Sequence, residues 1–158
     1  GERFYIFFSS DGLYAINKRK VRKISNEPFP SVTILDSEYF NNTYYLFDCL
    51  IYKGDSLIHK TELYDRIKKA KFFEDFMPYL FKVKEFKFAK EKDSLEYYAN
   101  LLLNEDRENN DGLIFTPSDF LTDMSPIYKW KYPAKMSIDF MVHKIYEKDG
   151  ISTNIKII

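Results

Sequence analysis

The 158-residue chain has little cysteine, few glycines and no net charge. Its one cysteine, Cys49, cannot form an internal disulfide, so we expect an intracellular, reducing compartment. The balance of 24 basic and 24 acidic residues argues against a chain-wide surface for nucleic acid or membranes, and leaves phosphate recognition to local clusters. No apolar run approaches the roughly 18 residues that span a bilayer, and no secretion-signal pattern is present. We therefore expect no membrane partner.

Hydrophobic residues make up 45% of the chain and aromatic residues 18%, enough for about one domain with a buried core. Three- and four-residue spacing predicts helices that begin near Thr61 and Asp93, the second with a capping box from Asp93 to Glu96. Strands outnumber helices and do not alternate with them, so the predicted class is α+β with mainly antiparallel sheets. Short apolar runs bounded by turn residues predict strands at 4–8, 13–17, 33–40, 44–52, 81–88, 113–116, 127–131, 137–144 and 151–157.

Four segments carry more specific expectations. The strand 44–52 is apolar on both faces, which predicts a central position in its sheet. The basic run 18–23 predicts a solvated loop, with contact to RNA phosphates as the alternative. The last two strand candidates alternate with period two across Asp149 and Gly150, which predicts a hairpin.

Metal-binding patterns based on histidine are missing. His59 and His143 are isolated, and neither has a Cys or His partner at ligand spacing. We therefore predict no zinc site.

Two acidic motifs are candidates for metal or sugar binding. Asp36 and Glu38 are two residues apart on one strand, so both carboxylates can point into one cleft. A solvated strand end is the alternative. Asp111 and Gly112 stand directly before a buried strand, and a simple Asp-Gly turn is the alternative there.

An aromatic motif and a basic motif are candidates for nucleotide binding. Phe47 belongs to an aromatic-rich strand that ends in an acid, and such a ring either stacks on a nucleobase or belongs to the core. Lys129 and Lys131 flank Trp130, which places two ammonium groups on one strand face. Two such groups clamp a phosphate, or else protect an edge strand from aggregation.

In their order along the chain, these motifs resemble those of the covalent nucleotidyltransferases, the superfamily of mRNA-capping enzymes and ATP-dependent polynucleotide ligases. Gly1 resembles the last letter of K-x-D-G, and Arg3 the arginine that follows in capping enzymes. The lysine of that motif would stand three positions before residue 1. The segment 33–38 is similar to the Asp-Gly-Glu motif, with Ser37 in place of glycine, a departure that adds a Cβ. The segment 45–48 resembles the strand whose aromatic residue lies on the purine.

The last two motifs resemble capping enzymes more than ligases. The segment Asp111-Gly112-Leu113-Ile114-Phe115 matches the capping form of the fourth motif. Lys129-Trp130-Lys131 followed by Ser137-Ile138-Asp139-Phe140 is similar to the fifth. The resemblance therefore favours GTP over ATP.

The resemblance implies a partial nucleotidyltransferase domain of the DNA-ligase type, ATP-grasp-like, over residues 1–158, followed in the family by an OB-fold domain. It implies an mRNA guanylyltransferase that passes GMP from GTP, through a lysine-GMP intermediate, to the 5'-diphosphate end of RNA. This chain alone would be inactive without the lysine. Other capping domains would be partners, in the nucleus or in a viral factory in the cytoplasm. The alternatives are an ATP-dependent ligase and a non-catalytic nucleotide-binding module.

The resemblance also implies a role for each motif residue. Lys129 and Lys131 would hold the α-phosphate, and Arg3 would approach the ribose and phosphate side. Phe47 would stack on guanine. Mg²⁺ or Mn²⁺ is implied because oxygen ligands suit hard cations. Asp111 would act near this metal, and Glu38 would bind either the ribose or water on the metal.

Overall fold

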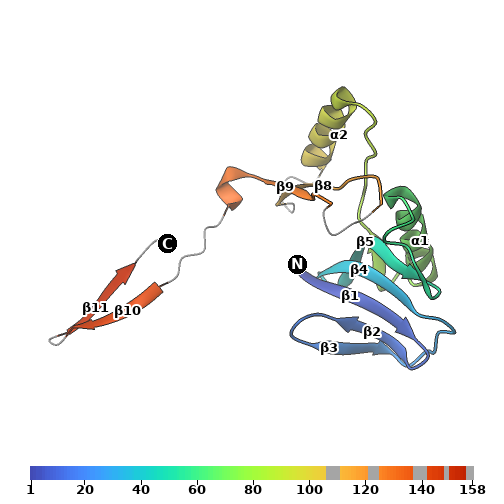
Figure 1. Cartoon of the computed structure of the whole chain (residues 1–158), viewed down its shortest axis with the longest axis horizontal. Coiled ribbons are helices and arrows are strands. Elements are labelled where there is room, and N and C mark those ends of the chain that lie inside the picture. Colours follow the sequence, from blue (N-terminus) through green and yellow to red (C-terminus); the bar gives the residue numbers. More distant parts are fainter. Residues whose placement is uncertain (106–110, 121–124, 137–141, 148–149, 156–158) are drawn as a thin grey trace.

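The structure of the chain, a computed structural model, describes residues 1–105, 111–120, 125–136, 142–147 and 150–155. Its class is α+β with mainly antiparallel strands, which confirms the predicted class. Figure 1 shows one large sheet with the helix α1 beside it, and two further pairs of strands. No helix in the described ranges is both long and apolar enough to cross a membrane.

The large sheet has seven strands in the order β3-β2-β1-β4-β5-β6, and β7 also pairs with β5. Only the β5–β7 pair is parallel. Since β5 has neighbours on both sides, its predicted central position is confirmed. The strands are β1 (Glu2–Ser9), β2 (Gly12–Ile16), β3 (Val21–Ser25), β4 (Thr33–Phe40), β5 (Thr43–Tyr52), β6 (Asp55–Ser56) and β7 (Phe81–Val83).

Two tight turns set the register of the first strands. Gly12 has φ 129°, and a Cβ there would lie 2.3 Å from the carbonyl oxygen of Ser25, so only glycine fits between β1 and β3. Asn41 and Asn42 have φ 47° and 61°, the left-handed conformation that two-residue hairpins require and asparagine tolerates. The first turn joins β1 to β2, and the second joins β4 to β5.

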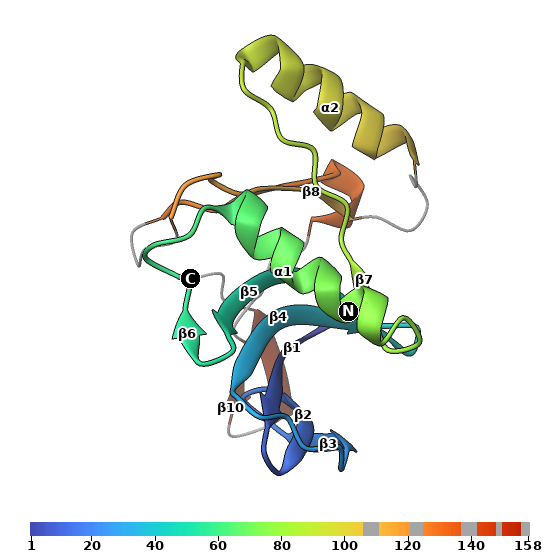
Figure 2. The same cartoon turned by 90° about the vertical axis from the view of Figure 1, so that its right-hand side faces the viewer.

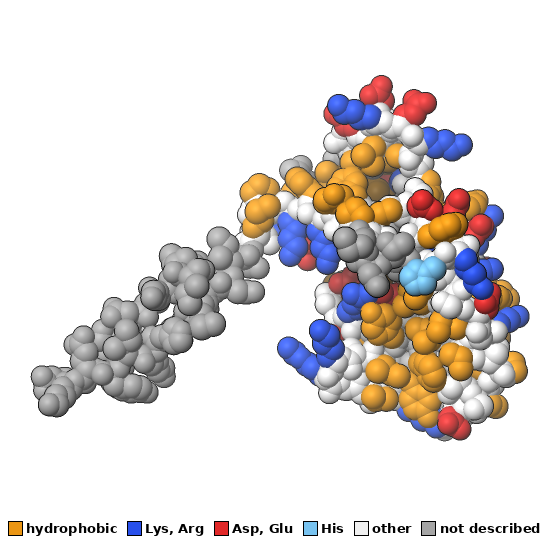
Figure 3. All heavy atoms as spheres, viewed as in Figure 1, with side chains coloured by type: hydrophobic (Ala, Val, Ile, Leu, Met, Phe, Trp, Pro, Cys, Tyr) orange, Lys and Arg blue, Asp and Glu red, His pale blue; other side chains and the backbone are white. Residues whose placement is uncertain are grey.

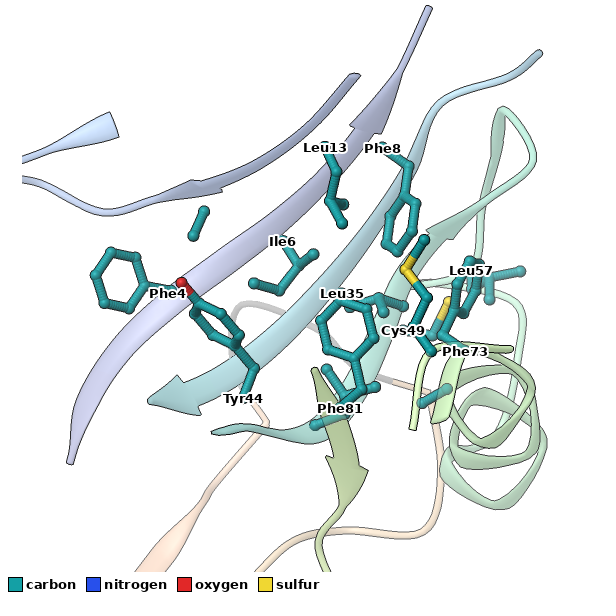
Figure 4. Close-up of a cluster of buried hydrophobic side chains, with 14 residues drawn as sticks. Phe4, Ile6, Phe8, Leu13, Leu35, Tyr44, Cys49, Leu57, Phe73 and Phe81 are labelled. Carbon is teal, nitrogen blue, oxygen red and sulfur yellow. The ribbon is translucent and has the colours of Figure 1, made fainter. Parts of the chain in front are cut away.

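The core lies between the sheet and helix α1 (Leu63–Phe76). The helix buries Leu63, Arg66, Ala70 and Phe73, which recur at three- and four-residue spacing and form one face. Figure 4 shows the hydrophobic core cluster, in which Phe73 of this helix lies among side chains of the sheet. The ring of Phe8 on β1 lies 4.5 Å from Phe73, centre to centre. Each such aromatic side chain contributes about 1.5–3 kcal/mol by its burial.

A second group of elements follows the large sheet. It comprises α2 (Lys92–Glu105), β8 (Gly112–Phe115), β9 (Tyr128–Lys131) and the short helix η1 (Pro133–Lys135), with β8 and β9 antiparallel. The amide of Leu63, at the start of α1, donates a 2.9 Å hydrogen bond to the carbonyl of Ser118. This bond connects the segment after β8 to the large sheet's helix.

The C-terminal strands β10 (Val142–Glu147) and β11 (Gly150–Ile155) pair antiparallel, as predicted for a hairpin. Asp149 of the expected turn and the segment 137–140 of the fifth motif lie outside the described residues. The motif's second half is therefore untested.

Three details of the sequence prediction were wrong. The basic run is not entirely a loop, because Val21–Ser25 forms the edge strand β3, where outward lysine and arginine side chains are tolerated. The strand expected at 81–88 ends at Val83, after its short parallel pairing with β5. Helix α2 begins one residue before Asp93, and Ser94 bonds with the backbone of Glu91 in place of the predicted capping box.

Candidate functional site

Five polar and aromatic residues meet on the large sheet, and we call them the Phe47 cluster. Its members are Arg3 on β1, Asp36 and Glu38 on β4, Phe47 on β5, and Lys84 directly after β7. Arg3 and Glu38 are partners in the β1–β4 register. The β4–β5 register shifts between Asp36 and Ser37, an irregularity that changes where neighbouring side chains point. Four separate chain segments therefore build one group.

Two cations lie over the ring of Phe47. The guanidinium carbon of Arg3 is 5.8 Å from the ring centre, and Nζ of Lys84 is 5.5 Å from it. Both distances fall within the range of cation–π attraction. The Phe47 side chain is only half-buried, whereas the neighbouring Leu46 is fully buried in the core. Phe47 is therefore not one of the core residues, which was the alternative for this motif.

Arg3 is held by a two-point bond to Asp36. Nε of Arg3 donates to Oδ1 of Asp36 at 2.9 Å, and its Nη2 donates to Oδ2. Burial raises the pKa of Asp36 above its ordinary value, against the opposing effect of the arginine. The same hydrogen bond raises the pKa of Arg3. The Arg3 side chain is 62% exposed, so a charged guanidinium of fixed position faces solvent beside the ring.

Glu38 forms an ion pair with Lys84, and the terminal amine of Gly1 lies 3.4 Å from its Oε1. Burial alone would raise the pKa of Glu38, but the hydrogen bond and charge of Lys84, together with the amine, outweigh burial and lower that pKa. The group is therefore a carboxylate at neutral pH. Such a carboxylate accepts hydrogen bonds from hydroxyl groups or from water on a cation.

Lys84 is the member of the cluster that the sequence did not reveal. Its amide donates to the carbonyl of Leu46 at 2.8 Å, which continues the parallel pairing of β7 with β5 and places Lys84 opposite Phe47. The one available signal was a lysine inside a strand candidate. Its neighbour Lys82 carries the same signal but is exposed and has no contact with Phe47 among the described residues.

Ser37 fits where the resembled motif has glycine. Its side chain is fully buried, and its Oγ donates a 2.8 Å hydrogen bond to the carbonyl of Phe4. A buried hydroxyl with a partner carries little cost. The serine is therefore accommodated in β4 between Asp36 and Glu38, with its hydroxyl bonded to β1.

Behind Phe47, a buried ion pair joins β5 to α1. Nε of Arg66 lies 2.7 Å from Oδ1 of Asp48, and its Nη2 lies 3.1 Å from Oδ2. Arg66 is fully buried, and its Nη1 also donates to the carbonyl of Thr61 at 2.7 Å. Asp48 is therefore a structural partner of the helix and is not free to bind a ligand. The pair therefore fixes β5 at the residue that follows Phe47.

The remaining predicted residues lie on the β8–β9 pair. Lys129 is opposite Ile114 and Lys131 is opposite Gly112, so the two lysines share one strand face, and both are exposed. Oδ1 of Asp111 lies 3.6 Å from Nζ of Lys135, and the Asp111 side chain is 81% exposed.

Gly112 is more than a turn residue. It has φ 142° and pairs with Lys131 of β9, and a Cβ there would lie 1.9 Å from the carbonyl oxygen of Trp130. Only glycine permits this approach of the two backbones. Gly112 therefore sets the spacing of the strand that carries Lys129 and Lys131.

The six predicted residues thus form two groups of three. Arg3, Glu38 and Phe47 belong to the large sheet, and Asp111, Lys129 and Lys131 to the β8–β9 pair. No hydrogen bond or ion pair joins these groups within the part of the chain that the structure describes. Figures 1 and 2 both show the β8–β9 pair above the N-terminal end of β1, and Figure 3 shows Lys and Arg side chains below that pair.

The acidic residues offer only part of a metal site. No group of three possible ligands among His, Cys, Asp and Glu occurs in the described ranges. Mg²⁺ commonly uses one or two carboxylates and takes its other oxygens from water and substrate phosphates. Asp111 and Glu38, the two carboxylates that the resemblance assigns to a metal, lie in the two separate groups and form ion pairs with Lys135 and Lys84. Compared with known proteins, the chain matches no family model and no curated sequence.

Proposed function

We propose that this chain is part of a covalent nucleotidyltransferase of the mRNA-capping class. Such an enzyme transfers GMP from GTP to the 5'-diphosphate end of RNA. One observation carries the proposal: Arg3, Glu38 and Phe47 were singled out by motif order, and they meet around one half-buried ring. Their meeting point has the chemistry of a nucleotide site, with a stacking face, a carboxylate and a fixed cation.

The cluster favours guanine over adenine. Nζ of Lys84 lies over the Phe47 ring, 5.5 Å from its centre, and has only donors to offer. Guanine presents the acceptors O6 and N7 along one edge, whereas adenine replaces O6 by an amino donor. A base stacked on Phe47 would therefore gain a hydrogen bond from Lys84 if it is guanine. Lys84 would exchange part of its ion pair with Glu38 for that bond.

The other residues serve the sugar and the phosphates. Glu38 would accept from ribose hydroxyls, and Arg3 would lie on the phosphate side of the ring. Lys129 and Lys131 would hold the α-phosphate between them through charge-assisted hydrogen bonds. Asp111 would share a Mg²⁺ or Mn²⁺ ion with the phosphates, and this ion would neutralise the charge that develops on pyrophosphate.

The proposed reaction has two steps. An upstream lysine amine forms a bond to the α-phosphorus while the bond to the β-phosphate oxygen breaks, and pyrophosphate leaves. The terminal β-phosphate oxygen of the RNA diphosphate then attacks the same phosphorus, and the phosphorus–nitrogen bond breaks. In this placement of the motif, Gly1 lies close to the proposed ribose-binding carboxylate of Glu38.

Nucleotide titration tests the proposal. We expect the chain to bind GTP more tightly than ATP by calorimetry. Phe47→Leu should weaken the binding free energies of GTP and ATP by about 1–3 kcal/mol each, because stacking is lost. The control Phe40→Leu, at an exposed aromatic residue on the same sheet, should leave both binding free energies unchanged. Lys84→Met should reduce the ratio of GTP affinity to ATP affinity. The matched control Lys82→Met should leave this ratio unchanged.

Other outcomes separate the alternatives. Tighter binding of ATP would favour the ligase. Binding of GTP without a covalent adduct, in a chain extended through the upstream segment, would favour a non-catalytic module. If Phe47→Leu binds both GTP and ATP as tightly as the wild type does, Phe47 does not stack on the base.

A further inference from the structure

A basic hairpin lies at the edge of the large sheet, outside the Phe47 cluster. We call it the β2–β3 basic hairpin and define it as residues 12–26. It holds five cations and no acidic residue in a chain of zero net charge. All five side chains are exposed: Lys18, Arg19, Lys20, Arg22 and Lys23. Such a local excess of positive charge attracts a polyanion.

The turn of this hairpin is fixed next to the candidate nucleotide site. Nδ2 of Asn17 donates to Oε1 of Glu2 at 2.8 Å, and Nζ of Lys20 lies 2.8 Å from Oε2 of Glu2. Oδ1 of Asn17 also accepts from the amides of Arg19 and Lys20, which closes the turn. Glu2 directly precedes Arg3 of the Phe47 cluster. The basic turn therefore lies at the same end of β1 as that cluster.

Aromatic rings lie among these cations. The guanidinium of Arg22 is 5.1 Å from the ring centre of Tyr39, and Nζ of Lys23 is 5.4 Å from that of Tyr14. Nη1 of Arg22 also donates to the hydroxyl of Tyr44 at 3.5 Å. These contacts hold a planar guanidinium against a ring while leaving it exposed. Figure 3 shows Lys and Arg side chains projecting from the region where Figure 1 places this turn.

We propose that the β2–β3 basic hairpin binds the backbone of single-stranded RNA, in the stretch that follows the 5' end. Cations interleaved with aromatic or guanidinium planes are the usual surface for single-stranded nucleic acid, because bases stack while phosphates meet the charges. The direction of the strand rests on the proposed function, which places the RNA end at the Phe47 cluster. The binding itself rests only on the hairpin. An anionic membrane surface is the competing partner, and it would need no stacking planes.

RNA affinity, measured by fluorescence anisotropy with a labelled 20-nucleotide single strand of mixed sequence, tests this inference. The variant Lys18→Gln/Arg19→Gln/Arg22→Gln removes three charges and leaves the Lys20–Glu2 pair in place. We expect at least tenfold weaker binding at 0.1 M salt. The slope of log affinity against log salt should fall by about two, since each lost contact to single-stranded RNA contributes about 0.7. The double variant Lys18→Gln/Arg19→Gln, which keeps Arg22, should lose an intermediate amount of RNA affinity. A graded loss of this kind distinguishes removal of charge from a folding defect.

The matched control removes three exposed lysines elsewhere, as Lys60→Gln/Lys68→Gln/Lys71→Gln. It should change RNA affinity less than twofold. Equal losses in both triple variants, or no loss in the hairpin variant, would overturn the inference. Binding of the wild-type chain to vesicles with 30% anionic lipid, without binding to RNA, would overturn it in favour of a membrane. The hairpin variant should bind GTP with the same affinity as the wild type. GTP binding therefore tests the nucleotide site, and RNA binding tests the hairpin, independently of each other.

Discussion

At the scale of single residues, Glu38 shows how a neighbouring cation changes an acid. Its folded pKa lies below the ordinary value of 4.5, because Lys84 and the terminal amine outweigh burial. An acid whose pKa is lowered in the folded state stabilises the fold at pH values above its ordinary pKa. That contribution is lost as the pH falls through the folded pKa. The ion pair therefore weakens in acid.

We predict that Lys84→Met raises the pKa of Glu38 toward or above its ordinary value, because burial then acts with less opposition. Carbon-detected NMR titration of the side-chain carboxyl measures this directly. Lys82→Met is the control, because Lys82 is exposed on the same short strand and does not contribute to the pKa of Glu38. An unchanged pKa in Lys84→Met would mean that the ion pair does not form in solution.

Motif order predicted Arg3, Glu38 and Phe47 as site residues, and the structure places these three together. Antiparallel pairing explains why Arg3 and Glu38 are neighbours, since β1 and β4 pair through a register that alternation restricts. Their role as site residues stays a prediction. Lys84 and Arg66 were missed for a different reason. Both depend on how β7 and α1 return to β5, and no local pattern encodes a parallel register or a helix packing angle.

At the scale of elements, the β8–β9 pair depends on one glycine. We predict that Gly112→Ala forces the two strands apart, because the new Cβ would overlap the backbone of Trp130 and φ 142° disfavours a side chain. Hydrogen exchange should show amides of β8 and β9 losing protection at least tenfold, while amides of β1 and β4 keep theirs.

Gly54→Ala is the matched control for this change. Gly54 also has positive φ, at 85°, but nothing lies within 4 Å of the position where its Cβ would be. It should therefore show only a backbone cost of about 1 kcal/mol, without local opening. Full protection of β8 and β9 in Gly112→Ala would contradict the close approach of these strands.

Elements were predicted well where turn chemistry and alternation agree. The strands β1, β4 and β5 follow the expected bounds closely because asparagine and glycine turns end them. The edge strand β3 was missed because it carries a run of exposed cations. In the sequence, such a run is equally typical of a loop and of an exposed edge strand. Helix α2 has no buried residue among those described, so packing does not fix where the helix begins. Its first turn is set instead by the local hydrogen bond from the amide of Glu91 to Oγ of Ser94.

At the scale of the whole molecule, the proposed nucleotide site draws on two groups of residues that come from different sheets. The large sheet supplies the stacking ring, its cations and a carboxylate, and the β8–β9 pair supplies two exposed lysines and Asp111. Alternation and turn residues predict most strands of each sheet. The placement of one sheet against the other depends on a few long-range contacts, such as the bond from Leu63 to Ser118, which no sequence pattern announces.

The central claim is that one nucleotide contacts both groups, and NMR titration of the isotope-labelled chain with GTP and Mg²⁺ tests it most directly. We predict that signals of Phe47 and Lys84 shift together with those of Lys129 and Lys131, with one dissociation constant that is lower for GTP than for ATP. Lys129→Ala should weaken binding several-fold without changing the free energy of unfolding by more than about 0.5 kcal/mol. Shifts confined to one sheet at saturating GTP, or two unrelated dissociation constants, would contradict the account.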